Sequence, residues 1–169
     1  MINEPELTRH HEPLTTNYYP LAMTLSTILC PLDFSATSSE LVAYAAALAV
    51  ATGAELRLLY VCEPQEDPAG RLPGESASAS PVPCAERLND LRAAAEQAGV
   101  VRVHTGIVRG EAAPTIVAEA KRQQADLIVI GAHGQTGLTR FLMGNTAEIV
   151  LRTACCATLL VRAPLLDGE

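Results

Sequence analysis

The sequence contains no tryptophan and few other aromatic residues, with four tyrosines and two phenylalanines among 169 residues. Large rings therefore cannot fill a hydrophobic core. Apolar residues still make up 49% of the chain, and 27 residues are alanine. We expect a core in which Ala, Val, Leu and Ile pack closely, as they do where helices lie tightly on a sheet. The length fits a single domain, for which roughly 100 to 200 residues are usual.

Positive charge is also scarce, because 12 Lys and Arg residues stand against 19 Asp and Glu residues, and Lys121 is the only lysine. Nucleic acids and anionic membranes are bound through clustered Lys and Arg side chains. The sequence has no such cluster and carries a net charge of −7. The apolar stretch at residues 21–32 is shorter than the ~20 residues that span a bilayer. We therefore expect no nucleic-acid partner and no membrane partner.

The five cysteines are odd in number, and their spacing lacks the paired CxxC units of a zinc site. They are typical of reduced thiols in a cytoplasmic protein, and no metal site is predicted. Cys155 and Cys156 precede a predicted strand, where thiols commonly serve as small packing residues.

Short apolar runs alternate with helical patterns from Thr27 onward. Strands are predicted over residues 27–32, 56–62, 101–108, 127–130 and 158–162. Helices are predicted from a capping box at residues 37–40 to Gly53, from about residue 85 to Gly99, from the turn containing Pro114 to residue 122, and near residues 146–153. In the third strand Val101, Val103 and Ile107 are expected on one face, as in a half-exposed edge strand. The alternation predicts an α/β fold with a five-stranded parallel sheet and helices on both faces.

The domain is predicted to span residues 25–164, between an N-terminal tail (1–24) and a C-terminal tail (165–169). Residues 63–83 contain five prolines and two glycines and lack periodicity, so they are predicted to form a flexible loop.

A glycine-rich segment follows the fourth predicted strand and contains Gly131, Gly134 and Gly144. The start of the helix that follows it can bind phosphate through its unpaired N–H groups and its positive dipole end. Asn145 can instead satisfy those donors as the cap of its own helix, and both alternatives are open. The Walker pattern GxxxxGK[ST] and the dinucleotide pattern GxGxxG are absent.

The spacing Gly131-x2-Gly134-x9-Gly144 after an apolar strand, together with ILCPLDFS at residues 28–35, resembles the universal stress protein family. The sequence LYV at residues 59–61 and Val108-Arg109-Gly110 match in the same order, and the resemblance covers about residues 27–162. It implies a Rossmann-like domain with strand order 3-2-1-4-5 in a cytoplasmic stress-response protein. It also implies a homodimer, formed through residues 157–162, that holds ATP, with or without Mg²⁺, at the carboxyl ends of the strands.

The family pattern places Pro31, Asp33 and the backbone of Val61 around adenosine. Around ribose and phosphates it places Gly131, His133, Gly134, Gly144, Asn145 and Thr146. The nucleotide-binding branch of the family usually has Ser or Thr where this chain has Asn145, and an amide can also donate a hydrogen bond. His133 can contact phosphate or act as an acid–base group, and Asp33 can accept hydrogen bonds from adenosine or act as a general base.

Three functions compete. The first is a nucleotide-responsive signalling dimer with an unknown protein partner. The second is a slow ATPase, which lacks an evident catalytic base or charge-stabilising cation beyond Arg140. The third is an interaction module that works without nucleotide. We therefore expect no catalytic residues and at most weak ATP hydrolysis.

Overall fold

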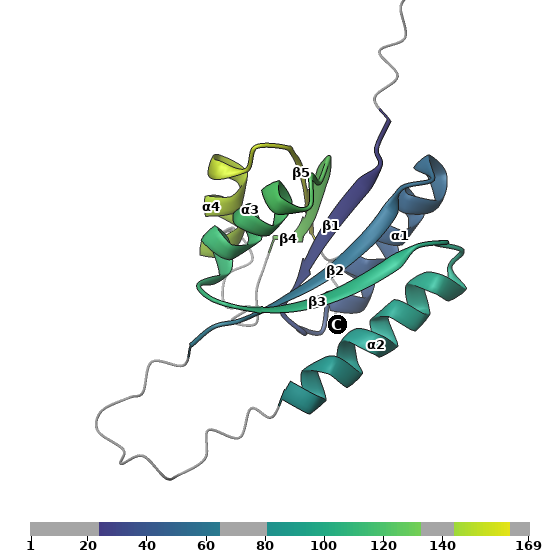
Figure 1. Cartoon of the computed structure of the whole chain (residues 1–169), viewed down its shortest axis with the longest axis horizontal. Coiled ribbons are helices and arrows are strands. Elements are labelled where there is room, and N and C mark those ends of the chain that lie inside the picture. Colours follow the sequence, from purple (N-terminus) through teal and green to yellow (C-terminus); the bar gives the residue numbers. More distant parts are fainter. Residues whose placement is uncertain (1–23, 65–80, 133–143, 163–169) are drawn as a thin grey trace, which may run out of the picture.

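In the described part of the chain, five parallel strands form one sheet in the order β3-β2-β1-β4-β5, and helices cover both of its faces (Figure 1). The computed structural model describes residues 24–64, 81–132 and 144–162, and only the backbone of residues 81–83. The strands are β1 (Thr27–Leu32), β2 (Glu55–Cys62), β3 (Val103–Arg109), β4 (Leu127–Gly131) and β5 (Ala157–Val161). The helices are α1 (Ser38–Thr52), α2 (Pro81–Gln97), α3 (Ala112–Arg122) and α4 (Asn145–Thr153). The predicted fold class and strand order are confirmed.

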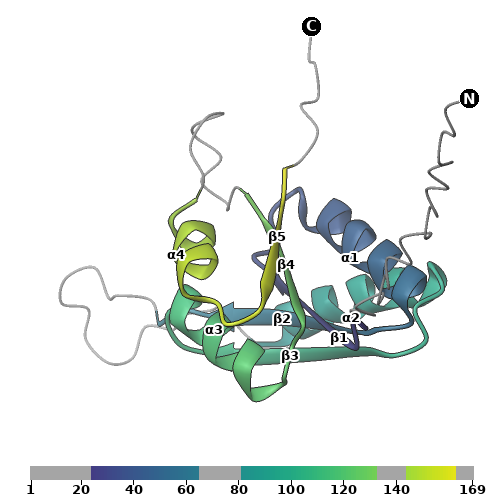
Figure 2. The same cartoon turned by 90° about the horizontal axis from the view of Figure 1, so that it is seen from above.

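Two hydrophobic layers lie on opposite faces of the sheet, and helices lie on both sides of the sheet in Figure 2. Helices α1 and α2 cover one face, and α3 and α4 cover the other. Successive residues of β1 alternate between the layers: Ile28 and Cys30 contact the first, and Leu29 contacts the second. All six residues of β1 are buried, which explains why the strand appears in the sequence as one continuous apolar run.

Alanines let α1 approach the sheet closely. Ala45, Ala46 and Ala49 are each at most 2% exposed and belong to the first layer. The helix ends at Gly53, whose φ of 74° lies in the left-handed region that glycine adopts without steric cost. The close packing expected from the alanine content and the predicted glycine end of this helix are both present.

Several local predictions differ from the structure. Helix α2 begins at Pro81, about four residues before its predicted start and inside the predicted loop 63–83, because proline is accepted in the first turn of a helix. Val101 is 92% exposed because it precedes the first residue of β3, and Ile107 is 41% exposed. Of the three residues expected on one face, only Val103 is buried.

The predicted tails and most of the predicted loop lie outside the described residues, apart from residues 24, 63, 64 and 81–83. Within the described part of the chain, no helix is both long and apolar enough to cross a membrane.

Candidate functional site

The ladder between the central strand β1 and its neighbour β4 ends early and leaves an opening in the hydrogen-bonded sheet. β1 pairs with β2 over six residues, from Thr27↔Glu55 to Leu32↔Tyr60. It pairs with β4 only at Ile28↔Leu127 and Leu29↔Ile128. Pro31 lies in the unpaired half of that boundary and has no N–H to donate. After β1 the chain continues to β2, which lies on one side of this boundary, and after β4 it continues to β5, which lies on the other side. The boundary between β1 and β4 is therefore a switch point of the strand order. Ligands of open α/β sheets bind at such a point, beyond the carboxyl ends of the strands.

A tight turn follows β1 at this opening. Asp33 Oδ1 accepts hydrogen bonds from the Ser35 backbone N–H at 2.9 Å and from Ser38 Oγ at 3.3 Å. The predicted capping box is wrong, because Thr37 makes no side-chain cap to α1. Its hydroxyl lies 3.1 Å from Ser35 Oγ instead. The carboxylate of Asp33 therefore organises the turn between β1 and α1.

Phe34, the second residue of this turn, has φ of 58°, a left-handed conformation that is a genuine outlier for a bulky residue. Its side chain is buried, at 8% exposure, and its ring centroid lies 4.5 Å from that of Tyr60. Arg87 of α2 donates a hydrogen bond from Nη2 to the Phe34 carbonyl oxygen at 2.7 Å. Backbone outliers held by surrounding contacts concentrate at functional sites.

Neither Phe34 nor Arg87 was among the residues predicted from the sequence. The two residues are 53 positions apart, and no local pattern links them. Burial and the neighbouring thiols of Cys84 and Cys62 raise the pKa of the Tyr60 hydroxyl above its ordinary value.

The start of α4 lies at the carboxyl end of β4. The Gly144 N–H donates to the Ala132 carbonyl oxygen at 2.8 Å, and the Ala132 N–H donates to the Val161 carbonyl oxygen at 2.8 Å. These bonds bring Gly131 and Gly144 to one edge of the sheet, followed by Asn145 and Thr146. Gly144 is the residue that caps α4. The alternative in which Asn145 caps its own helix is therefore wrong: Asn145 is the first helical residue, and its side chain is exposed.

A carboxylate of the chain itself caps the start of α3. Glu63 Oε1 accepts a hydrogen bond from the Ala112 N–H at 2.9 Å, which satisfies one of the helix's unpaired donors. Val61, two residues before Glu63, is half-buried against the hydrophobic layer under α3 and α4. Of the predicted site residues, His133 and Gly134 lie outside the described part of the chain.

The cysteines differ in exposure. Cys30 is buried, and burial raises its pKa to about 12. Cys156 packs against the second hydrophobic layer, as predicted, but its neighbour Cys155 is exposed. The two residues precede β5, where successive side chains point to different sides. The packing role predicted for Cys155 is therefore wrong.

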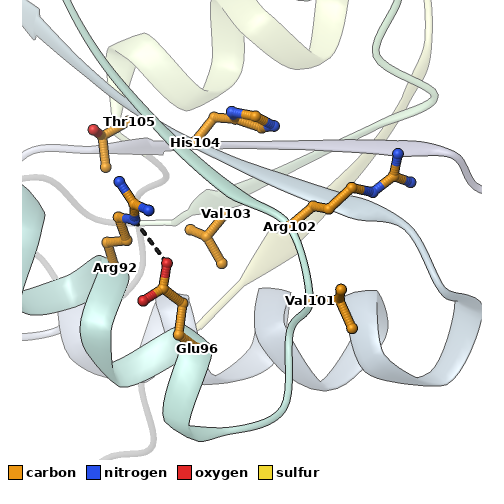
Figure 3. Close-up of a pocket in the computed structure, with 7 residues that line it drawn as sticks. All are labelled: Arg92, Glu96, Val101, Arg102, Val103, His104 and Thr105. Carbon is orange, nitrogen blue, oxygen red and sulfur yellow. Dashed lines mark hydrogen bonds and ion pairs between the residues drawn. The ribbon is translucent and has the colours of Figure 1, made fainter.

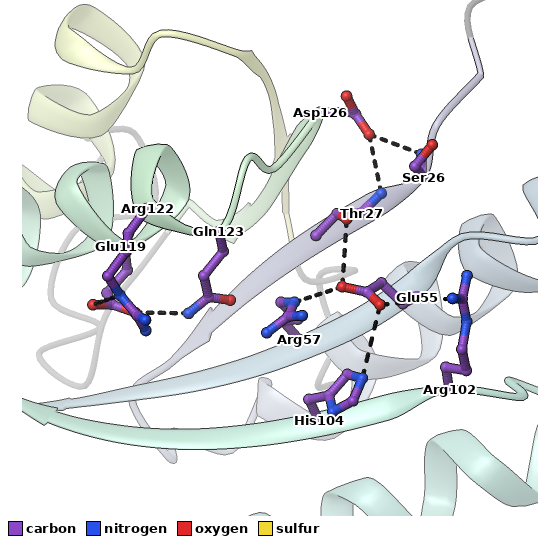
Figure 4. A network of polar contacts seen from close by, with 10 residues as sticks. All are labelled: Ser26, Thr27, Glu55, Arg57, Arg102, His104, Glu119, Arg122, Gln123 and Asp126. Atoms are coloured by element: carbon purple, nitrogen blue, oxygen red, sulfur yellow. Dashed lines mark hydrogen bonds and ion pairs between the residues drawn. The ribbon is translucent and has the colours of Figure 1, made fainter.

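A polar network lies at the opposite, amino-terminal edge of the sheet (Figure 4). Glu55 Oε1 accepts a hydrogen bond from Arg57 Nε at 2.7 Å, and Glu55 Oε2 lies 3.9 Å from Arg102 Nη1 and 3.8 Å from His104 Nε2. Burial acts to raise the pKa of Glu55, but the hydrogen bond and charge of Arg57, followed by the charges of His104 and Arg102, leave it below its ordinary value. Asp126 accepts hydrogen bonds from the backbone N–H groups of Ser26 and Thr27 at 2.8 and 3.0 Å.

An open hollow of about 440 Å³ adjoins this network, between the end of α2 and the start of β3 (Figure 3). Arg92, which lines it, is paired with Glu96 at 2.7 Å. The other lining residues run from Val101 to Thr105. The carboxylate of Glu55 and the cations around it form one polar network beside this hollow.

Comparison with known proteins identifies the family. The Universal stress protein family matches residues 24–162, which include every described strand and helix. The chain belongs to the universal stress protein family. A universal stress protein of Methanocaldococcus jannaschii is 35% identical over 142 residues, which cover 81% of this chain and 82% of that protein.

Solved structures of universal stress proteins share the fold. UspA from Lactobacillus plantarum superposes with a TM-score of 0.71 and 26% identity, over 82% of this chain and 98% of that one. One universal stress protein was solved in complex with cAMP (TM-score 0.65, 23% identity, 82% of this chain and 98% of that one). The protein from Archaeoglobus fulgidus was solved in complex with dAMP (TM-score 0.61, 20% identity, 82% and 98%).

Proposed function

We propose that this universal stress protein binds ATP at the carboxyl ends of β1 and β4 and acts as a nucleotide-responsive signalling dimer in a stress response. The observation that carries the proposal is the opening between β1 and β4 beyond Leu29↔Ile128. The turn at Asp33 lies on one side of this opening. On the other, the Gly144–Ala132 hydrogen bond holds the start of α4.

The two sides of the opening suit different parts of the nucleotide. Pro31, Asp33 and the backbone of Val61 would hold adenosine, with the Asp33 carboxylate accepting hydrogen bonds from hydroxyl or amino groups. Gly131, Gly144, Asn145 and Thr146, together with His133 and Gly134, would hold ribose and phosphates. The N–H groups of the first turn of α4 favour a phosphate. Two solved relatives carry adenine nucleotides, cAMP and dAMP, which supports this ligand class.

The structure favours α4 over α3 for the phosphates. Glu63 already places a carboxylate at the start of α3, and a phosphate there would meet a like charge. The cap of α4 is Gly144, which has no side chain to block an approaching anion. Among the described residues, no three or more His, Cys, Asp or Glu side chains form a group that could hold a metal. Mg²⁺ would therefore arrive on the phosphates, as it commonly does.

The Gly144→Val variant tests the site by calorimetric titration with ATP. Gly144 has extended dihedral angles, with φ of −61° and ψ of 146°, which valine adopts readily. The variant should therefore fold and lose ATP binding, because its side chain would occupy the place of a phosphate. Gly106→Val on β3 is the control, since a Cβ there lies 3.9 Å from Leu59 Cδ1, an ordinary contact. Wild-type affinity in Gly144→Val would exclude the phosphate position.

Mass spectrometry of the small molecules released from the denatured protein separates the competing functions. Near-stoichiometric ATP or ADP supports nucleotide binding, and conversion of added ATP to ADP by the purified protein would favour the slow ATPase. A chain without released nucleotide and without titration heat would be an interaction module that works without nucleotide.

The proposed dimer involves residues 157–162 at the β5 edge of the sheet. Leu159 on β5 is 40% exposed, and an edge strand offers unpaired backbone groups to a second copy. Leu159→Arg should give a monomer, because the added charge would be buried between the two copies. Ile107→Arg is the matched control, since Ile107 is 41% exposed on the opposite edge strand. Light scattering that finds wild-type protein monomeric at micromolar concentration contradicts the dimer.

A further inference from the structure

Arg87 joins α2 to the turn that follows β1. Its Nη2 donates to the Phe34 carbonyl oxygen at 2.7 Å, and its guanidinium carbon lies 4.6 Å from the centroid of the Phe34 ring. One cation therefore contacts both the backbone and the ring of the same residue. A planar guanidinium can make both contacts at once, whereas a lysine ammonium is a point charge.

The residue that Arg87 holds needs external support. Phe34 has φ of 58°, where a bulky side chain is disfavoured, and such a conformation persists only when surrounding contacts determine it. Those contacts include the Tyr60 ring, 4.5 Å from the Phe34 ring, and Arg87. The Tyr60 contact fixes the ring alone. The hydrogen bond from Arg87 fixes the carbonyl and with it the orientation of the backbone.

The orientation of that backbone and the place of the Asp33 carboxylate depend on each other. Asp33 directly precedes Phe34, and its Oδ1 accepts from the Ser35 N–H at 2.9 Å. If Phe34 relaxed to a negative φ, the Ser35 N–H would point elsewhere and the carboxylate would lose this bond. The geometry thus links a cation on α2 to the placement of Asp33.

We propose that Arg87 is a positioning residue that holds the Phe34 turn and thereby presents the Asp33 carboxylate to the nucleotide. This inference rests on the proposed nucleotide site. Arg87 acts through the turn and does not contact the ligand. Coupling of this kind is reciprocal, so nucleotide binding should also tighten the contact between α2 and the turn.

The first test measures the turn without any ligand. Arg87→Met keeps an unbranched side chain but removes the charge and the donors. Arg92→Met is the control, because Arg92 lies on the same helix and pairs with the exposed Glu96. Hydrogen exchange of the Ser35 and Ser38 amides should be faster in Arg87→Met and unchanged in Arg92→Met, while the amides of β1 stay protected in both. Unchanged exchange in Arg87→Met overturns the inference.

The second test measures ATP affinity in a double-mutant cycle. Arg87→Met should weaken ATP binding about tenfold, as expected when a disfavoured backbone conformation loses one support. Arg87→Lys should recover part of the loss, and Arg92→Met should show none. In an Asp33→Ala background, Arg87→Met should have no further effect. An equal loss in that background shows that Arg87 does not act through Asp33.

The two tests keep the inference separate from the proposed function. If exchange is faster in Arg87→Met but the wild-type protein binds no ATP, the proposed function is wrong and the role of Arg87 in the turn stands. If exchange is unchanged in Arg87→Met and the wild-type protein binds ATP tightly, the role given to Arg87 is wrong and the proposed function stands.

Discussion

Replacing Glu55 with glutamine tests the polar network at the amino-terminal edge of the sheet. The carboxylate is 15% exposed, and its partner Arg57 is 31% exposed, so solvent screens the pair only in part. Glutamine keeps an oxygen that can accept from Arg57 but removes the charge. A hydrogen bond to a charged group contributes about 1.5 to 3 kcal/mol and a neutral one about 0.5 to 1.5 kcal/mol, so the difference is about 1 kcal/mol.

Arg102 and His104 add little to this figure. Their contacts with Glu55 are 3.9 and 3.8 Å long, and their side chains are 59% and 52% exposed. Exposed pairs contribute about 0 to 1 kcal/mol. We therefore expect Glu55→Gln to lower the free energy of unfolding by about 1 to 1.5 kcal/mol at pH 7.

Urea unfolding at several pH values is the assay, with Glu148→Gln as the matched control. Glu148 is 44% exposed and pairs with Arg152 at 2.9 Å in the i,i+4 relation, which contributes about 0.3 to 0.5 kcal/mol. The pKa of Glu55 is lowered in the folded protein from its ordinary value of 4.5. Its contribution is therefore complete above 4.5 and is lost as the pH falls through the lower folded pKa. Equal losses in the two variants at pH 7, or a Glu55 effect that persists in acid below its folded pKa, refute the reasoning.

Three further predictions concern other parts of the fold. Gly53→Ala should destabilise the protein by about 1 kcal/mol in thermal unfolding, because alanine tolerates a positive φ poorly; unchanged stability would contradict the left-handed end of α1. Cys155 should react with iodoacetamide in the native protein while Cys30, buried with a pKa of about 12, should react only in denaturant, as peptide mass spectrometry can show. Ile128→Ala should cost about 2 to 5 kcal/mol in urea unfolding because the side chain is fully buried, whereas Val101→Ala, at 92% exposure, should cost almost nothing.

The strands and helices were predictable wherever burial produces a recognisable pattern of apolar residues in the sequence. β1 was predicted with its observed ends because each of its residues is buried and the apolar run has no interruption. The predicted glycine end of α1 is confirmed because a left-handed residue favours glycine strongly. The start of α2 was predicted late, since Pro81 indicates a loop as readily as the first turn of a helix.

The candidate site was less predictable than the fold. Thr37 matched the capping pattern, but its hydroxyl lies beside Ser35 Oγ, and the Asp33 carboxylate accepts the hydrogen bonds of the turn. The sequence pattern does not show which of these competing local hydrogen bonds forms. The contact between Arg87 and Phe34 depends on how α2 packs against β2, which no short sequence pattern records. The positions of Gly131, Gly144 and Asn145 follow from the strand order. Their role in phosphate binding stays a prediction.

Ala132 is the point at which three segments of the chain meet. It is buried, at 2% exposure; its N–H is bonded to Val161 at the end of β5, and its carbonyl oxygen to Gly144 at the start of α4. A buried backbone bond is costly to break without a replacement. A displacement of the start of α4 that kept both bonds would shift Ala132 and, with it, the end of β5. The proposed phosphate site and the proposed dimer edge are thus connected through the backbone of one buried residue.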